Sequence, residues 1–156
     1  MKPGVFTQLH IHLVFAVKYR ERLLNEVQRK EVFSYMSGLL TNKNHKTIII
    51  NGYSDHVHAF LGLNSAMSIS DVVADLKRSS SIFINEKKWF KGKFQWQEGY
   101  GAFSYSKSHV ENVYNYILNQ KVHHQRKAFK DEYLDLLKNF DIEYDERYLF
   151  EFFENV

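Results

Sequence analysis

One segment organises the rest of the chain: Asp55-His56-Val57-His58-Ala59-Phe60. The segment lies in a run that is typical of a β-strand. Because successive side chains of a strand alternate between its two faces, His56 and His58 point to one face, and Asp55 and Val57 to the other. Two imidazoles on one face can bind one metal ion if a third ligand comes from elsewhere in the chain. Without that ligand, the pattern indicates only two histidines on a half-exposed strand.

The composition sets the class of protein. A chain of 156 residues with 44% hydrophobic and 16% aromatic residues can bury a core of its own, and we expect one domain over residues 1–156. Cysteine is absent, which excludes disulfides and thiolate metal sites and fits a cytoplasmic location. No apolar run approaches the roughly 20 residues of a membrane helix, and the first residues lack the shape of a signal peptide. The net charge of +3 permits nucleic-acid binding without demonstrating it.

Apolar periodicity, capping residues and turn residues predict the order of elements along the chain. The expected elements are a strand over 8–18, a helix capped by Asn25 and running to Leu40, strands over 48–53 and 56–63, a helix capped by Ser70 with apolar positions to Phe83, a last strand in two pieces over 94–96 and 101–105, and helices over 107–120 and 131–139. The acidic and aromatic tail over 142–153 matches no regular pattern.

This order predicts an α+β fold of the ferredoxin-like, or split βαβ, class. We expect an antiparallel four-stranded sheet with two helices on one face and with added C-terminal helices. The first and third strands form the central pair in this arrangement. The other face of the sheet is then free for a ligand, a partner or a further helix.

The predicted helix over 107–120 offers a third ligand. Tyr116 and Gln120 are four residues apart, so they share one face of this helix. The Gln120 amide oxygen, with the two imidazoles of His56 and His58, gives three ligands and leaves coordination positions open. Such a site suits Mg²⁺ or Mn²⁺ held partly by water and by phosphate oxygens of a substrate. The alternative is an ordinary amphipathic helix with a buried tyrosine and an exposed glutamine.

Several motifs in order resemble one family, the single-tyrosine HUH transposases of small bacterial insertion sequences, and the related repeat-associated tyrosine transposases share the same core. The name HUH describes the His-hydrophobic-His pair. The resemblance covers nearly the whole chain, and it is carried by the segments His12-Leu13-Val14-Phe15, Gly52-Tyr53-Ser54-Asp55-His56-Val57-His58, Ser70-Asp71-Val72-Val73-Ala74-Asp75-Leu76-Lys77, Trp96-Gln97-Glu98-Gly99-Tyr100-Gly101-Ala102-Phe103-Ser104 and Tyr116-Ile117-Leu118-Asn119-Gln120, the last followed by His123-His124.

The resemblance implies an activity and a set of site residues. Tyr116 matches the nucleophile of the family, and His56, His58 and Gln120 match its metal ligands. It implies a DNA transposase that cuts and rejoins single-stranded DNA through a 5′-phosphotyrosine, depends on Mg²⁺ or Mn²⁺, and recognises hairpins near the ends of the element. It also implies a homodimer, in which the tyrosine helix of one subunit can complete the metal site of the other.

Exposed cations and aromatics are the side chains that hold a single strand, through its phosphates and its bases. Two groups fit this role, one directly after the first strand and one in the second helix. The candidate DNA-binding residues of the two groups are Lys18, Tyr19, Arg20, Arg22, Lys77 and Arg78. Trp89 and Lys93 are further candidate contacts, in the connector after the second helix. Each of these is also compatible with a solvated surface charge or a core aromatic.

Three other functions remain open at this level. A ferredoxin-like module that binds nucleic acid without catalysis explains the fold and the charge, but leaves the histidine pair and the tyrosine motif to chance. An HUH replication initiator or relaxase has the same chemistry, commonly with additional domains or another order of motifs. A metal-dependent hydrolase that activates water forms no covalent adduct with DNA, and a denaturing gel distinguishes it from a transposase.

Overall fold

The computed structural model describes residues 2–156. Its β-strands are β1 (His10–Ala16), β2 (Lys46–Tyr53), β3 (His56–Gly62) and β4 (Gly101–Tyr105). Its α-helices are α1 (Glu26–Asn42), α2 (Ile69–Lys87), α3 (Val110–Leu118), α4 (Gln120–Arg126) and α5 (Phe129–Asn139). Short 3₁₀ turns cover Arg20–Arg22, Lys107–His109 and Glu146–Tyr148.

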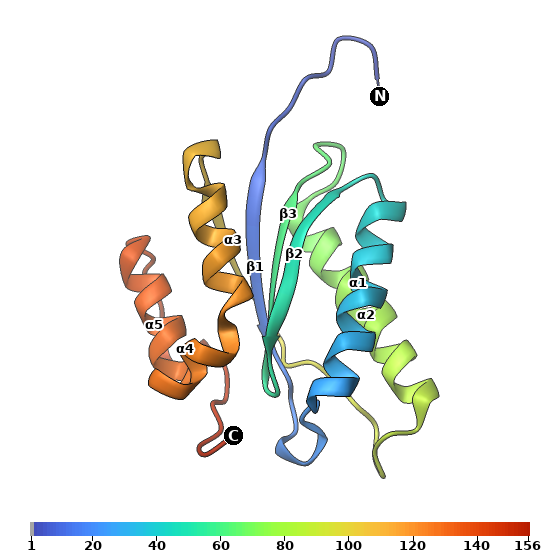
Figure 1. Cartoon of the computed structure of the whole chain (residues 1–156), viewed down its shortest axis with the longest axis vertical. Coiled ribbons are helices and arrows are strands. Elements are labelled where there is room, and N and C mark those ends of the chain that lie inside the picture. Colours follow the sequence, from blue (N-terminus) through green and yellow to red (C-terminus); the bar gives the residue numbers. More distant parts are fainter. Residues whose placement is uncertain (1) are drawn as a thin grey trace.

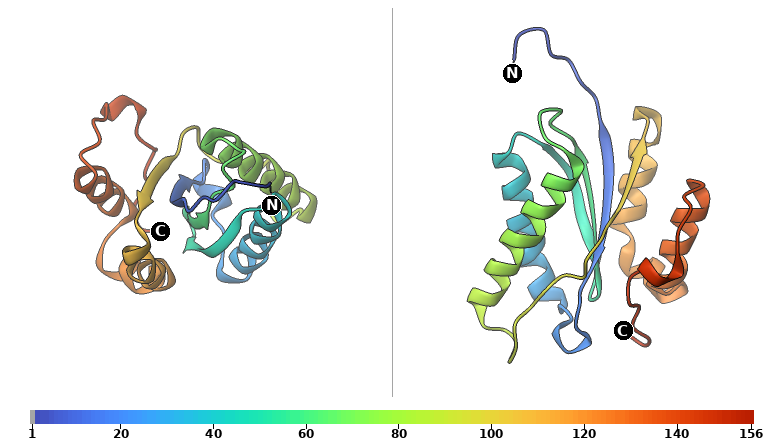
Figure 2. Two further views of the ribbon diagram at one scale, coloured as in Figure 1. Left: turned by 90° about the horizontal axis from the view of Figure 1, so that it is seen from above. Right: turned by 180° about the vertical axis from the view of Figure 1, so that it is seen from behind.

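The four strands form one antiparallel sheet in the order β2-β3-β1-β4. The first and third strands are the central pair, as the sequence predicts for a split βαβ arrangement. Helices α1 and α2 cover one face of the sheet, and α3, α4 and α5 lie on the other face (Figures 1 and 2). The α+β class is therefore confirmed, with the second face occupied by the C-terminal helices. Within the described part of the chain, every helix is too short or too polar to traverse a lipid bilayer.

Alternation along the central strands separates the core from the site. Leu13, Phe15 and Val57 are buried in the large cluster beneath α1 and α2. The alternate residues of the same strands face α3 to α5, where Phe60 packs against Val113 and Ile117 of α3 in a second buried cluster. His12, His56 and His58 share this second face with Phe60, because residues two apart on a strand point the same way.

Helices α1 and α2 start at capping residues, one of them shifted from the predicted position. Asn25 caps α1 in a full capping box with Gln28, as expected. Helix α2 begins at Ile69 because the Ser68 hydroxyl accepts the Asp71 backbone N–H, and the prediction that Ser70 is the cap is wrong by two residues. Both serines lie within one turn of the helix start, so the sequence alone does not separate them.

The predicted helix over 107–120 is divided in the structure. A 3₁₀ turn precedes α3, which ends at Leu118, and Gln120 is the first residue of α4. Asn119 lies between the two helices with φ −95° and ψ 26°. Its side-chain amide donates to the Asn115 carbonyl at 2.8 Å. Asparagine competes in this way with the regular helical pattern, which accounts for the break.

The last strand is shorter than predicted. Only 101–105 forms β4, whereas Trp96 makes an isolated antiparallel bridge with Val17. Gly99 has φ +86°, a conformation that non-glycine residues rarely adopt, and it ends the first piece before it can continue into the sheet.

Gly52 gives a test of the hairpin that carries the histidine pair. A Cβ atom at Gly52 would lie 2.2 Å from the His56 carbonyl oxygen, a backbone atom that cannot move away without shifting β3. We expect Gly52→Ala to lower the free energy of unfolding by about 1–3 kcal/mol, the cost of overpacking a buried site. Urea unfolding followed by circular dichroism measures this change.

Gly38→Ala is the matched control. Gly38 lies in α1, and a Cβ atom there meets no atom within 4 Å. Alanine at this exposed helical position should raise the free energy of unfolding by about 0.5–1 kcal/mol. Equal effects of the two substitutions would contradict the close approach of Gly52 to β3.

Candidate functional site

His56 and His58 lie at the start of β3 on the sheet face that α3 to α5 cover. Both side chains are buried, and their ring centroids are 5.0 Å apart. The β2–β3 turn places His56 at the first position of the strand, and His58 follows two residues later on the same face. The same-face pair predicted from the alternation is therefore present.

The Nδ1 atom of His56 contacts Asp55 Oδ1 at 2.7 Å, and its Nε2 atom faces the Gln120 amide oxygen at 2.9 Å. The ring stacks on Phe129 of α5 with centroids 3.9 Å apart. The expectation that Asp55 points away from His56 is wrong. Asp55 belongs to the turn before β3, where the alternation of a strand does not apply.

The second imidazole also has a partner on each nitrogen. Nδ1 of His58 lies 2.7 Å from Nε2 of His12, which comes from β1. Nε2 of His58 lies 2.8 Å from Glu132 Oε1, which comes from α5. The Nε2 atoms of both site histidines therefore face the C-terminal helices, where a ligand that bridges them would sit.

Glu132 is a site residue that the sequence analysis missed. Its Oε1 atom is also 3.5 Å from His56 Nε2, and its Oε2 atom accepts from the Gln120 amide at 3.2 Å. The carboxylate is 7% exposed and therefore belongs to the interior of the site. One signal was available, because Glu132 falls on the buried stripe of α5, between Phe129 and Leu136 at helical spacing. A charged residue at such a position is rarely buried without a partner.

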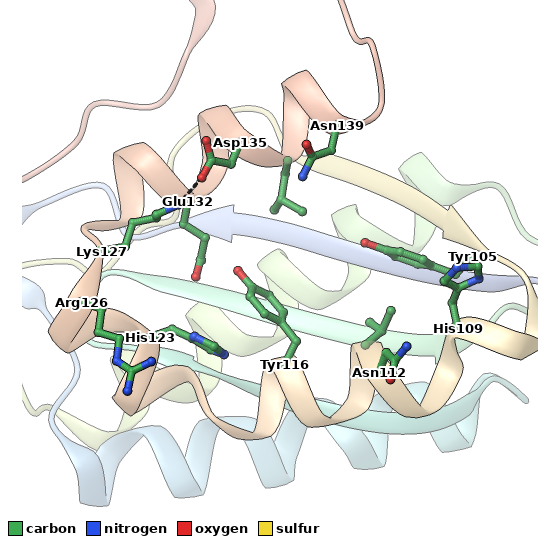
Figure 3. Close-up of a pocket in the computed structure, with 12 residues that line it drawn as sticks. Tyr105, His109, Asn112, Tyr116, His123, Arg126, Lys127, Glu132, Asp135 and Asn139 are labelled. Atoms are coloured by element: carbon green, nitrogen blue, oxygen red, sulfur yellow. Dashed lines mark hydrogen bonds and ion pairs between the residues drawn. The ribbon is translucent and has the colours of Figure 1, made fainter.

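Tyr116 reaches the same place from α3. Its ring meets that of His58 edge-to-face with centroids 6.0 Å apart, and it also packs against His123 at 4.8 Å. The hydroxyl group points toward the Glu132 carboxylate (Figure 3). Burial raises the pKa of the Tyr116 phenol, and the negative charge of Glu132 raises this pKa further. The phenol is therefore protonated at neutral pH in this arrangement.

A groove of about 510 Å³ between α3 and α5 gives access to the tyrosine (Figure 3). Tyr116 and Glu132 lie at its centre, and His123 and Arg126 lie at one end. Tyr105, His109, Asn112 and Asn139 line the other end. The groove thus joins a cationic end to an end with aromatic and amide groups, and the Tyr116 hydroxyl lies between them.

The charges of the site are coupled. Burial alone would lower the pKa of His56, but the Asp55 and Glu132 carboxylates outweigh burial and raise this pKa to about 9. Burial dominates at His58 and lowers its pKa despite the contact with Glu132. Burial would raise the pKa of Glu132, but hydrogen bonds from His56 and His58 outweigh it and hold this pKa below its ordinary value. The site accordingly holds a charged His56, a neutral His58 and an ionised Glu132.

The donor atoms fit a divalent cation. One nitrogen of each histidine and one oxygen of Glu132 all lie within 4.8 Å of one another. The Gln120 oxygen faces the same His56 nitrogen. Two imidazoles with oxygen donors form a set that Mn²⁺, Mg²⁺ and similar cations accept. Tyr116, His56, His58 and Gln120, which the sequence analysis singled out, are therefore brought together, although Gln120 comes from α4 rather than from the helix of Tyr116.

Comparison with known proteins identifies the family of the chain. The family described as "Transposase IS200 like" matches residues 5–120. The chain belongs to this family. The transposase for insertion sequence element IS200 of Salmonella typhimurium is 29% identical over 114 residues, which are 70% of this chain and 74% of that protein. The ISDra2 transposase TnpA of Deinococcus radiodurans is 27% identical over 124 residues, which are 75% of this chain and 87% of that protein.

Solved structures confirm the fold of this IS200-like transposase. A Deinococcus radiodurans protein, described as a candidate transposase, superposes with a TM-score of 0.60 at 24% identity, covering 77% of this chain and 96% of that one. A REP-associated tyrosine transposase bound to a REP hairpin superposes with a TM-score of 0.58 at 12% identity, covering 80% of this chain and 74% of that one. Glu132 lies beyond residues 5–120, the segment that the family matches.

The candidate DNA-binding residues of this transposase fall into two environments. After β1, the Arg22 guanidinium lies 4.4 Å from the centre of the Tyr19 ring, and the Lys18 ammonium lies 5.5 Å from it. Arg20, in the same turn, donates to the backbone carbonyl of Glu154. This basic turn directly follows Ala16, which pairs with His56 across the sheet, so it lies at the same end of the sheet as the site.

The second group of candidates, Lys77 and Arg78 on α2, forms hydrogen bonds within the protein. The Lys77 ammonium donates to the carbonyls of Gln97 and Gly99 at 2.8 and 2.6 Å. Burial lowers the pKa of Lys77 to about 8. Arg78 donates to Asp75 at 3.1 Å on the exposed side of α2. Because its ammonium already donates to backbone carbonyls, Lys77 is a weaker candidate for a contact with DNA than the residues of the basic turn.

The charge on His56 generates a prediction about cation binding. A cation that takes His56 Nε2 must displace a proton, so protons and cations compete for the site below pH about 9. The affinity for Mn²⁺ should rise from neutral pH up to about pH 9, approaching about tenfold per pH unit for one released proton. Calorimetric titration of the metal-free protein at several pH values measures this rise.

Asp55→Asn is the control for the cause. It removes a carboxylate that holds the proton on His56, so the pKa of His56 should fall and the rise in affinity should level off at lower pH. An affinity that does not change with pH would show that His56 is not displaced by the cation.

Proposed function

We propose that this transposase cuts and rejoins single-stranded DNA, with Tyr116 as the nucleophile and a divalent cation, Mg²⁺ or Mn²⁺, held by His56, His58 and Gln120. Glu132 joins the set as a fourth ligand. The observation that carries the proposal is the convergence of Tyr116 with these four side chains beside a groove that Tyr116 and Glu132 line, on a chain of the IS200-like family.

The covalent step accounts for both cutting and rejoining. The Tyr116 oxygen attacks the scissile phosphorus and loses its proton, the bond to the 3′ oxygen breaks, and that oxygen leaves as a 3′-OH after taking up a proton. The product is a 5′-phosphotyrosine, which conserves the free energy of the phosphodiester. A second 3′-OH can then attack this bond, releasing Tyr116 and joining two strands without ATP.

The residues of the site have separate roles in the proposed reaction. When bound, the cation polarises the phosphate and neutralises charge that develops on it. His56 and His58 fix the position of the cation on the rigid sheet, and Gln120 closes the set from α4. Tyr116 is presented by α3 beside this set, with His58 and His123 packed against its ring. Held in this way, its hydroxyl faces the groove beside Glu132, where it would meet a phosphate that enters the groove.

The groove between α3 and α5 suits one unpaired strand. Its ends carry cationic and aromatic groups, which contact phosphates and stack on bases respectively. A paired duplex is wider than a single strand and would have to separate its strands to bring a phosphate to the half-buried Tyr116 at the centre of the groove. We infer that the groove receives the single-stranded segment at the cut, while the basic turn of Lys18, Tyr19, Arg20 and Arg22 holds DNA nearby.

Partners and location complete the proposal. A REP-associated tyrosine transposase of the same fold was solved with a REP hairpin, and we propose that hairpin DNA is the partner of this chain as well. We propose one catalytic domain over residues 1–156, active as a homodimer in the cytoplasm. In a single chain, Tyr116 and Gln120 already lie beside His58 and His56, which supports a site formed within one subunit.

One observation favours a second function. His56, His58 and Glu132 form a two-histidine, one-carboxylate set, which in other proteins holds a metal that activates water for hydrolysis. A hydrolase of this kind would cut DNA and leave no protein attached to it. The position of Tyr116 beside the same set favours the tyrosine as the nucleophile, and the trapping of an adduct decides between the two.

Tyr116→Phe tests the nucleophile. The change removes one oxygen, so folding and hairpin binding should survive while the covalent adduct disappears, a loss of activity of at least about a thousandfold. Single-stranded DNA with a hairpin from an element end is incubated with the protein and Mn²⁺. The adduct is detected as a slow band on a denaturing gel, and mass spectrometry identifies the modified residue.

Tyr114→Phe is the matched control. Tyr114 lies two residues away on α3, and 38% of its surface is exposed, outside the groove. This variant should form the adduct at the wild-type rate. A 5′-phosphate attached to Tyr114, Tyr105 or any residue other than Tyr116 would refute the assignment, and cutting without an adduct would favour the hydrolase.

Salt dependence tests the basic turn. Affinity for hairpin DNA should fall steeply with salt, because neutralising phosphates releases counterions. Arg22→Ala should weaken binding and reduce the slope of log affinity against log salt by about one. Fluorescence anisotropy at several salt concentrations measures both.

Arg147→Ala is the comparison variant for this test. Arg147 is exposed and paired with Asp145 in the 3₁₀ turn near the C-terminus. Its removal should leave the slope unchanged. Equal slopes for wild type and Arg22→Ala would exclude the basic turn as the path of the DNA.

A further inference from the structure

His12 of β1 is a buried titratable group that the proposed chemistry does not use. Its side chain has no exposed surface, and its Nε2 atom lies 2.7 Å from His58 Nδ1. The two rings are nearly parallel, with centroids 5.0 Å apart. The contact follows from the register, because His12 pairs with Phe60 and is therefore the diagonal neighbour of His58 on the same face of the sheet.

The surroundings of His12 are aromatic. Phe60, Phe103 and Tyr105 lie around its ring, with centroids 5.8 to 6.5 Å away. Among residues 2–156, no hydrogen-bond partner faces its Nδ1 atom. Burial, followed by the neighbouring His58, lowers the pKa of His12 well below its ordinary value, so the ring is neutral. An aromatic residue would fill this box without leaving a polar atom unpaired, so the imidazole calls for an explanation.

The hydrogen-bond partners determine which ring nitrogens of His58 and His12 carry a hydrogen. Glu132 accepts at His58 Nε2, so this nitrogen carries the hydrogen of the neutral ring. His58 Nδ1 must then accept, and His12 Nε2 donates to it. His12 Nδ1 is left as a bare lone pair, and an unpaired acceptor is a commoner buried feature than an unpaired N–H.

The contact between His12 Nε2 and His58 Nδ1 can also form when a cation binds His58 Nε2. A nitrogen that binds a cation carries no hydrogen, so the hydrogen of a neutral His58 moves to Nδ1. His12 Nε2 then accepts instead of donating. An imidazole can take either role at the same atom, whereas a phenyl ring can take neither.

The two histidine ligands are thus supported by different groups. Asp55 holds His56 through its Nδ1 atom, and His12 holds His58 in the corresponding way. Asp55 is a carboxylate in a turn, whereas His12 is a neutral ring fixed in the central strand of the sheet. Partners of this kind set the orientation and the hydrogen position of a metal-binding imidazole.

We propose that His12 is a positioning residue that fixes the ring orientation of His58 through the contact at His58 Nδ1, and so aims His58 Nε2 at the cation. This inference rests on the proposed cation site. It assigns no contact between His12 and DNA, substrate or cation.

Two substitutions of similar size separate the role of the His12 Nε2 atom from its packing. A glutamine amide can reach about the position of a histidine Nε2, whereas the shorter asparagine amide reaches about that of Nδ1. His12→Gln should therefore bind Mn²⁺ nearly as the wild type does. His12→Asn, and His12→Phe with its apolar ring, should bind Mn²⁺ about 10–100-fold more weakly. Calorimetry on the whole chain without DNA measures these affinities.

A second measurement does not need the cation. In the metal-free chain, ¹⁵N correlation spectra of the histidine rings should show one form of His58, with the hydrogen on Nε2, for wild type and His12→Gln. His12→Asn and His12→Phe should shift and broaden the His58 signals, because the ring loses its partner at Nδ1 and is no longer held in one orientation. His10→Asn is the control, since His10 is on the same strand face but lies beside Phe60 and pairs with Gly62 and Tyr105 across the sheet.

The outcomes separate the two proposals. Wild-type Mn²⁺ affinity and wild-type His58 signals in His12→Asn and His12→Phe would overturn the role of His12. If the wild type itself bound no Mn²⁺, the proposed cation site would fail, and the spectra would still decide whether His12 fixes His58. Circular dichroism confirms that each variant is folded. If His12→Asn did not fold, the comparison of His12→Gln with His12→Phe would carry the test.

Discussion

The arrangement of the site depends on one buried carboxylate meeting two buried imidazoles. An ionised group removed from water is costly unless it is paired, and Glu132 is paired with His56 and His58 at once. A protonated His56 between Asp55 and Glu132 leaves a net charge of −1 on the three groups. A divalent cation that replaces the proton brings their sum to zero. The charge that α5 introduces therefore fits the cation better than it fits the metal-free state.

The C-terminal tail explains how α5 is held in place. Phe129 stacks on His56, and Tyr133 packs against Phe150 of the tail with centroids 4.9 Å apart. The amide of Gln97 donates to the Glu151 and Val17 carbonyls, and its oxygen accepts the Glu151 N–H. The tail is thus fastened to the end of β1 while its aromatic residues cover α5. The segment over 142–153, which matches no regular pattern in the sequence, has a role that only tertiary contacts reveal.

The sequence predicts what short-range periodicity controls. Alternation placed His56 and His58 on one face, and the order of elements predicted β1 and β3 as the central pair; both are confirmed. The wrong predictions concern residues at which a local sequence rule is overridden by another contact. Asp55 lies in a turn and turns back to His56, and Asn119 divides the helix that spacing alone predicted as continuous. Glu132 is 74 residues from His58, and no local pattern relates the two.

The metal-binding donors and the negative charge of the site come from different parts of the chain. Within residues 5–120, which the family matches, the donors His56, His58 and Gln120 are all neutral when they bind a cation. The negative charge beside them comes from Asp55, whose carboxylate contacts His56, and from Glu132, which lies outside that segment. A site without Glu132 would leave the cation to be neutralised by the phosphate of the DNA alone. On the proposed function, Glu132 would bind the cation more tightly before DNA arrives, and the cation would then attract the phosphate less strongly. In the proposed reaction, the docking of α5 would therefore set a balance between holding the cation and binding the substrate, because the joined strand must also be released.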